Sequence, residues 1–251
     1  MSPMSETLLR TAAGVLVLVV ITVTVLAAAR VPRRWAPGWA VLRGAVQLAA
    51  ISLVLRGVIG EARWVGAAVA VMFAVAATTV ARRLGFTWRR LGLVAAAMAA
   101  GVLLALGAAF TTGAVDPTPR YVLALGGIVI GGSMTTATLA GRRLLATTQA
   151  RWPEVEGWLA LGAAPRQATA AIAREAAGEA LVPAIDQTRT TGLVTLPGAF
   201  VGAIFGGASP LEAGRFQIVV LAAILAAGSV TAVLLLHALA PVRTRPQPPA
   251  P

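Results

Sequence analysis

The stretch Glu154-Val155-Glu156-Gly157-Trp158-Leu159-Ala160-Leu161-Gly162-Ala163-Ala164-Pro165 interrupts a chain that is dominated by long apolar runs. Apolar runs of about 20 residues are long enough to cross the hydrocarbon core of a bilayer as helices. The interrupting stretch is charged and contains helix-forming residues. Gly162 is expected to end a short helix here, and Pro165 suits the first turn of the next one. The pattern predicts membrane-spanning helices that carry a short helix outside the hydrocarbon.

Composition supports a membrane protein with no separate soluble domain. Hydrophobic residues make up 58% of the 251 residues and charged residues only 12%, whereas a soluble domain carries roughly 25% charged residues. We expect an all-α polytopic protein with about seven transmembrane helices. The predicted spans lie near 8–29, 39–59, 63–81, 91–110, 121–140, 190–207 and 216–239. Residues 166–182 are expected to form a cytoplasmic or interfacial helix that leads into the sixth span, although a broken or re-entrant element is also compatible with this region.

The arginines set the predicted orientation, because cytoplasmic segments of membrane proteins are enriched in basic residues. Most arginines fall in alternate connecting segments: Arg30, Arg33, Arg34, Arg82, Arg83, Arg89, Arg90, Arg142, Arg143, Arg151, Arg166, Arg174, Arg189, Arg243 and Arg245. With an odd number of spans, this places the N-terminus outside and the C-terminus in the cytoplasm. The net charge of +12 therefore reflects topology and gives no reason to expect nucleic acid binding.

The residue types that are missing exclude several chemistries. All 21 basic residues are arginine, so no P-loop lysine is available to bind ATP phosphates. Cysteine is absent and His237 is the one histidine, which excludes thiol catalysis and multi-histidine metal sites. No catalytic constellation is evident, and we expect a protein that is not itself an enzyme and binds no cofactor of its own.

The segment 154–165 is expected to display apolar side chains beside charges. Trp158 and Leu161 would be exposed and flanked by Glu154, Glu156 and Arg151, and exposed apolar residues with a charged rim are typical of a docking surface. Alternatively, Trp158 lies in the lipid interface, where tryptophan is enriched.

Polar residues within or beside the spans are candidates for a translocation path. Arg43 and Gln47 lie one helical turn apart, and Asp186 lies close to Arg189 in the least regular region. Arg43 could instead extend to the cytoplasmic edge, and Asp186 could form a boundary ion pair.

Small residues recur at spacings that allow helices to approach closely. These are Gly127, Gly131, Gly198, Gly202 and Gly206. The hydroxyl residues near the fifth span are expected mainly to bond across helices or to their own backbone.

Four segments resemble the permeases of ABC transporters, in particular the Fet-type permeases of bacteria. They are residues 156–168, Arg43-Gly44-Ala45-Val46-Gln47-Leu48, Ile130-Gly131-Gly132-Ser133-Met134, and 181–198, which is followed by matching stretches at 208–213 and 216–219. The similarity covers roughly residue 40 to the end of the seventh span. Two positions depart from the family pattern: Gly132, where asparagine is usual, and Arg189, where lysine is frequent.

The resemblance implies one permease domain at 1–240 of a multi-pass protein in the bacterial plasma membrane, with a cytoplasmic coupling region near 142–182 and a disordered cytoplasmic tail at 241–251. A separate subunit would bind ATP and Mg²⁺, and the permease would form a homodimer. The coupling residues would be Glu154, Glu156, Trp158, Leu161, Gly162, Ala163 and Pro165. The path would include Arg43, Gln47, Ser133, Met134, Asp186 and Arg189.

The resemblance also implies a transported substrate. Bacterial members are associated with export of iron or another metal ion, and plant relatives with aluminium tolerance and nucleotide-sugar export. An ion-driven secondary carrier and a non-transporting membrane scaffold are the alternatives from other functional classes. The residues offer no metal-binding cluster, and the metal site stays open.

Overall fold

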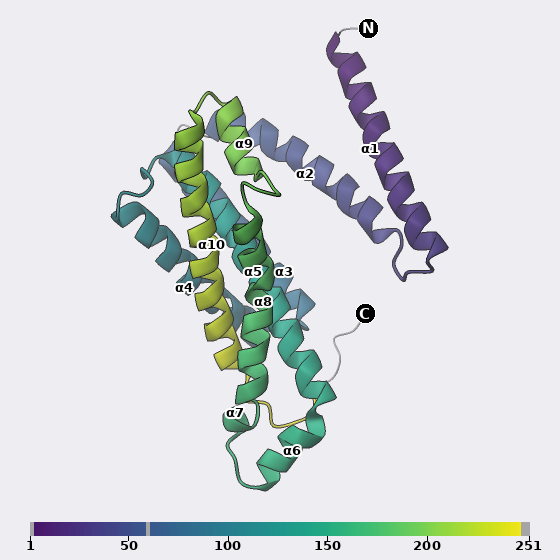
Figure 1. Cartoon of the computed structure of the whole chain (residues 1–251), viewed down its shortest axis with the longest axis vertical. Helices are drawn as coiled ribbons and strands as arrows, with labels where there is room; N and C mark the ends of the chain where they lie inside the picture. Colours follow the sequence, from purple (N-terminus) through teal and green to yellow (C-terminus); the bar gives the residue numbers. More distant parts are fainter. Residues whose placement is uncertain (1–2, 59–60, 247–251) are drawn as a thin grey trace. The chain divides into compact units, whose positions relative to one another are not determined.

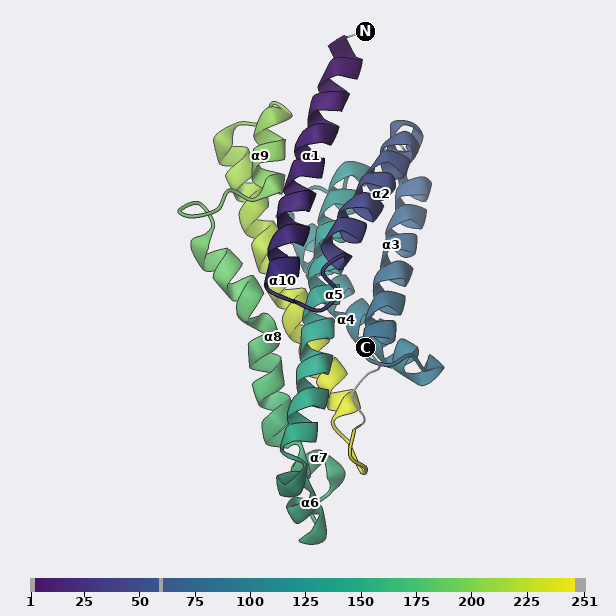
Figure 2. The same cartoon turned by 90° about the vertical axis from the view of Figure 1, so that its right-hand side faces the viewer.

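The computed structural model describes residues 3–58 and 61–246, with side chains described at 6–52 and 61–246. Within these ranges the regular elements are all helices, apart from one isolated bridge between Thr191 and Thr195. The chain divides into two compact units, one that contains α1 and α2 and one that contains α3 to α10 (Figures 1 and 2). The all-α class is therefore confirmed.

The first unit is a pair of helices, α1 (Pro3–Ala28) and α2 (Ala36–Val58). They pack against each other through Gly38, where a Cβ would lie 3.2 Å from Val19 Cγ1. These helices correspond to the first two predicted spans; residue 59 of the second span lies outside the described residues. Arg43 and Gln47 lie on α2 with exposed side chains.

The second unit is a helical bundle. Its long helices are α3 (Ala62–Arg83), α4 (Trp88–Thr111), α5 (Pro119–Ala150), α8 (Ala170–Thr190) and α10 (Pro210–Leu239). Helix α10 packs along α4, α5 and α8, and α3 packs on α5. The short helices α6 (Trp152–Ala160) and α7 (Pro165–Ala168) lie at one end of the bundle, and α9 (Gly198–Phe205) lies at the other (Figures 1 and 2).

Local sequence explains where these helices begin. Thr87 Oγ1 accepts a hydrogen bond from Arg90 N at 3.1 Å, which caps α4. Thr118 caps α5 in the same way, and Pro119 occupies its first turn. A capping box starts α10: Ser209 Oγ accepts from Glu212 N, and Ser209 N donates to the Glu212 carboxylate at 3.0 Å.

Glycines lie at the closest contacts between helices. Most of these are not the glycines that the sequence spacing indicated. A Cβ at Gly127 would lie 2.8 Å from Met72 Cε, so Gly127 does pack α5 on α3. Gly131, Gly198 and Gly202 have no neighbouring atom within 4 Å of that position in the described chain, and Gly206 meets only backbone of α9. Within the described chain, these four glycines therefore make no close contact with a neighbouring helix, and their predicted packing role stays a prediction. The tightest approach is instead at Gly101 of α4, where a Cβ would collide with the carbonyl oxygen of Ala227 on α10.

Five helices in the described ranges are long and apolar enough to cross a membrane: α1, α3, α4, α5 and α10. The predicted sixth span at 190–207 is wrong as a single helix, because α8 ends at Thr190 and residues 191–197 are irregular before α9 begins. The alternative of a broken element fits this region. The count of seven spans and the orientation remain predictions.

Helix α8 is also longer and better packed than an interfacial helix over 166–182 would be. Ile172, Ala176 and Ala180 are buried at four-residue spacing against α5 and α10. The charged residues of α8 lie outside this buried stripe. Arg189, grouped with the cytoplasmic arginines by sequence, lies at the far end of α8 from α6 and α7 (Figure 1). Residues 241–246 contain no helix, and residues 247–251 of the predicted tail lie outside the described residues.

Candidate docking surface and polar cleft

Helix α6 forms where the sequence predicts a short helix, and Gly162 ends it. Gly162 has a φ of +89°, a left-handed conformation that glycine adopts without steric cost. Its N–H donates to Leu159 O at 3.0 Å, and Ala163 N donates to Trp158 O at 3.0 Å, which satisfies carbonyls at the helix end. Pro165 then begins α7, as expected. The predicted helix, its terminator and the following helix start are confirmed.

One side of α6 anchors it to the bundle. Val155 is completely buried and packs in a cluster with Ala140 and Leu144 of α5, Ile172 of α8 and Leu236 of α10. Just beyond α7, buried Thr169 donates from Oγ1 to Ala240 O at 2.6 Å, at the end of α10. The segment is therefore fixed at both ends to the long helices.

The other side of α6 is exposed. Trp158 of α6 is 52% exposed, and Leu161, the C-cap residue three positions further on, is 82% exposed. The Glu156 side chain is exposed too and forms no ion pair within the described ranges. The surface formed by Glu156, Trp158 and Leu161 is called the α6 surface below. Its docking role remains a prediction.

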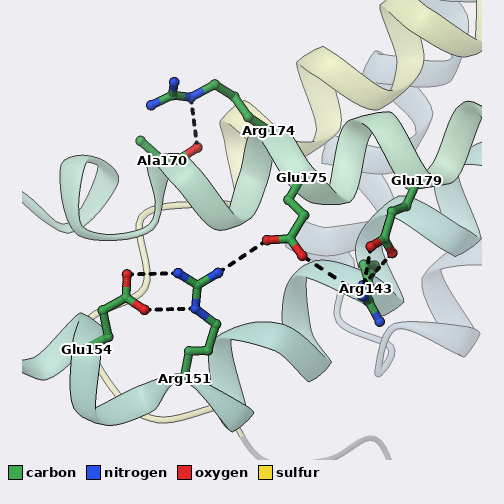
Figure 3. Close-up of polar contacts among 7 residues, drawn as sticks. All are labelled: Arg143, Arg151, Glu154, Ala170, Arg174, Glu175 and Glu179. Carbon is green, nitrogen blue, oxygen red and sulfur yellow. Dashed lines mark hydrogen bonds and ion pairs between the residues drawn. The ribbon is translucent and has the colours of Figure 1, made fainter.

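An ion-pair network joins α6 to α5 and α8 (Figure 3). Arg151, between α5 and α6, binds both carboxylate oxygens of Glu154 at 2.8 and 2.9 Å and Glu175 of α8 at 3.2 Å. Arg143 of α5 binds Glu179 of α8 at 2.7 Å and lies 4.0 Å from Glu175. The hydrogen bonds and negative charge of Glu154 raise the pKa of Arg151, so its guanidinium stays protonated. Glu154, predicted as a docking residue, is thus occupied with Arg151.

The predicted path residues of α5 and α8 do not share one surface. Ser133 is completely buried, its Oγ has no hydrogen-bond partner among the described residues, and Met134 packs against the core. Ser133 is therefore not exposed on the surface of this chain, and its place on a translocation path stays a prediction. Asp186 and Arg189 have exposed side chains on α8 and form a loose pair at 3.9 Å.

A polar cleft lies next to these predicted residues, between α5 and α8. Its volume is about 280 Å³. The lining residues are Ile128, Gly131, Gly132, Thr135, Thr136, Ala180, Pro183, Ala184, Gln187 and Ile224. Pro183 has no N–H, so the Glu179 carbonyl one turn earlier receives no helical hydrogen bond from it. From the sequence, Gln187 was missed and the hydroxyl residues Thr135 and Thr136 were assigned a structural role. The cleft could have been predicted from the polar residues of α5 together with a proline inside the neighbouring helix α8.

The described residues contain no group of three or more His, Asp or Glu side chains that could hold a metal ion. At the irregular segment, the Thr190 carbonyl accepts from the N–H groups of Leu193, Val194 and Thr195. Gln187 O likewise accepts from Thr191 N. These carbonyls are already engaged, so they do not form an open ring of oxygen ligands.

The fold and the site define a polytopic α-helical membrane protein with a charged, partly apolar protrusion at one end of its bundle. Residues 10–241 match the model of the "Uncharacterised protein family (UPF0014)", and the chain belongs to that family. No solved structure matches the chain.

Three relatives show the range of the family. The UPF0014 membrane protein STAR2 of Oryza sativa subsp. japonica is 36% identical over 78% of this chain and 70% of its own length. Protein ALUMINUM SENSITIVE 3 of Arabidopsis thaliana is 33% identical over 78% and 72%. The probable iron export permease protein FetB of Escherichia coli (strain K12) is 32% identical over 56% and 54%.

Proposed function

We propose that this chain is the membrane-spanning permease subunit of an ABC transporter, driven by ATP hydrolysis in a separate ATP-binding subunit. The name of the FetB relative, a probable iron export permease, supports the permease class. The observation that carries the proposal is the α6 surface, because Trp158 and Leu161 are exposed on a helix that Val155 and Arg151 fix to the bundle. A surface fixed to the bundle can transmit a movement of the bound ATPase to the long helices, whereas a free loop cannot. The ATP and Mg²⁺ would be bound by the partner, and this chain would be non-catalytic.

The network provides the route from the α6 surface to the membrane helices. A displacement of α6 moves Arg151, which holds Glu175 of α8. Helix α8 then runs past the polar cleft to the irregular segment at 191–197. We infer that α8 carries the movement, because Arg151 binds it near its start and it lines the polar cleft further along the chain. Two copies of the chain would assemble with two ATPase subunits.

The polar cleft is the proposed part of the translocation path in this chain. Thr135 and Gln187 lie in it, and the exposed Asp186 neighbours Gln187 on α8. A metal ion such as iron would have to pass weakly bound by hydroxyl and side-chain amide oxygens. The hydroxyl and amide lining favours equally a polyhydroxylated solute such as a nucleotide sugar, which is the second candidate substrate.

Reconstitution with the cognate ATPase tests the proposal. The two proteins are incorporated into liposomes, and ATP hydrolysis is measured with iron, other metal ions and sugar nucleotides in turn. The proposal expects ATPase binding and stimulation by one of these substrate classes. A chain that binds the ATPase but never supports transport is a scaffold, and transport driven by an ion gradient without the ATPase indicates a secondary carrier.

A further inference from the structure

A groove lies between the start of α8 and the end of α10, on a part of the surface that the α6 surface and the polar cleft do not use. Its volume is about 270 Å³, and it is lined by Arg166, Arg174 and His237 together with apolar residues. Arg166 precedes α8 within α7, Arg174 lies one turn into α8, and His237 lies near the end of α10. Three groups that can donate hydrogen bonds therefore share one groove.

The two arginines differ from those of the ion-pair network. Arg143 and Arg151 bind glutamates, but Arg166 and Arg174 have no carboxylate partner among the described residues. Arg166 Nη2 donates to His237 O, and Arg174 Nε donates to Ala170 O, both at 3.3 Å. Figure 3 shows Arg174 pointing away from Glu175 and Glu179. Each guanidinium retains unused donors, and the groove carries uncompensated positive charge.

The walls of the groove are apolar, and they continue into an exposed apolar surface on α10. Ala170, Ala173 and Leu236 line it, and Val233, also in the lining, is 59% exposed. The 30 residues of α10 are about 45 Å long, against a hydrocarbon core of about 30 Å. The helix is therefore long enough for its last turns, which include His237, to reach the depth of lipid headgroups.

We propose that this groove binds an anionic phospholipid, with the phosphate held by Arg166, Arg174 and His237 and an acyl chain lying along Val233. Arginine presents several donors in a planar fork that matches phosphate oxygens. Basic pockets between membrane helices at headgroup depth are suited to such lipids. A free phosphate would use the charges but leave the apolar wall uncovered, so the combination selects a lipid. The bound lipid joins α7–α8 to α10.

The test is native mass spectrometry of the purified full chain with dioleoylphosphatidylglycerol and dioleoylphosphatidylcholine. The wild type is expected to bind the phosphatidylglycerol more tightly. The double variant Arg166→Gln/Arg174→Gln should bind it about thirtyfold more weakly, from about 1 kcal/mol for each arginine. Arg82→Gln/Arg89→Gln, which removes two exposed arginines outside the groove, is the charge-matched control and should retain the preference.

A second variant keeps the test decisive should the double variant fail to fold. Ala170→Glu adds an acid in the first turn of α8, where the helix dipole favours it. The new carboxylate lies one turn from Arg174 and should displace the lipid phosphate while α8 stays intact. Retained selectivity in a folded Ala170→Glu or Arg166→Gln/Arg174→Gln protein overturns the proposal. Equal loss in the control, or full displacement of the lipid by millimolar inorganic phosphate, also overturns it.

Discussion

The guanidinium of Arg151 lies 3.2 Å from the carboxylate of Glu175, although the two residues are 24 positions apart in the chain. Arg151 immediately precedes α6 and Glu175 lies on α8, so this contact joins the protruding helix to a long helix of the bundle. Glu175 also lies within reach of Arg143 on α5, at 4.0 Å. One carboxylate thus connects three helices at the end of the molecule where we place the ATPase.

Replacing this carboxylate tests the transmission route. Glu175→Gln keeps the size of the side chain but removes its charge, so Arg151 retains only Glu154. We expect transport per ATP hydrolysed to fall at least about fivefold. The thermal midpoint should change little, because exposed ion pairs contribute little to stability. Glu61→Gln, which affects only a pair with Arg63, is the control and should leave coupling unchanged.

The exposed tryptophan of α6 should dominate ATPase binding. Trp158→Ala is expected to weaken the complex by about 2 kcal/mol, roughly thirtyfold in Kd, because aromatic anchors carry most interface energy. Trp88 is 80% exposed at the start of α4 and provides a matched control. Titration of the purified ATPase against the full chain in nanodiscs measures both variants. If Trp158 serves only as a lipid anchor, the two alanine variants will bind equally well.

Two glycines of the α6 region should respond in opposite directions to the same substitution. Gly162→Ala forces a side chain into a left-handed conformation and should destabilise the protein by about 1–2 kcal/mol. Gly157 lies inside α6 with no atom within 4 Å of a Cβ, so Gly157→Ala should stabilise it by about 0.5–1 kcal/mol. Thermal unfolding in detergent compares them. Identical midpoints would contradict the end of α6 described above.

The bundle makes a similar prediction at α4. Gly101→Ala drives a methyl group into the backbone of α10 and should cost about 1–3 kcal/mol. Gly92→Ala, on the same helix with open space around it, should be neutral or stabilising. Denaturant titration of the two variants checks the α4–α10 contact, and a stable Gly101→Ala protein would show that these helices do not meet there.

The proposed translocation path predicts different effects on transport for polar residues of α5 and α8. Gln187→Leu removes the amide from the polar cleft, and Asp186→Asn removes the adjacent charge; both should reduce transport while ATPase binding persists. Ser133→Ala should transport normally, because that hydroxyl is buried in the core. Flux into proteoliposomes measures all three. Loss of transport in the Ser133 variant alone would place the path elsewhere.

Local signals in the sequence were sufficient for α6 and for the apolar helices. Gly162 and Pro165 determine where α6 ends and α7 starts through their own backbone preferences, which need no information from the rest of the fold. The helices α3, α4, α5 and α10 are uniformly apolar over the length of a bilayer. Both features depend on residues close together in the chain.

Helix α8 was assigned poorly because its partners are distant in sequence. Glu175 and Glu179 suggest a helix outside the bundle, yet Arg151 and Arg143 neutralise them from 24 and 36 residues away. Ala176 and Ala180, at four-residue spacing, form a narrow buried stripe on α8. The mean hydropathy of the helix does not reveal this stripe, because it averages the buried alanines with the charged residues. The cleft was missed for the same reason, since Thr135 and Gln187 meet only after α5 and α8 pack.

Disulfide cross-linking tests the central claim most directly, because the chain contains no cysteine. Leu161→Cys places a single thiol on the α6 surface, and Leu211→Cys places one at the opposite end of the bundle, with both positions more than three-quarters exposed. Each variant is co-expressed with a cognate ATPase that carries surface cysteines. The account predicts a cross-linked permease–ATPase species for Leu161→Cys and none for Leu211→Cys. A cross-link only at Leu211→Cys, or labelling of Leu161→Cys by an impermeant reagent added outside intact cells, would contradict it.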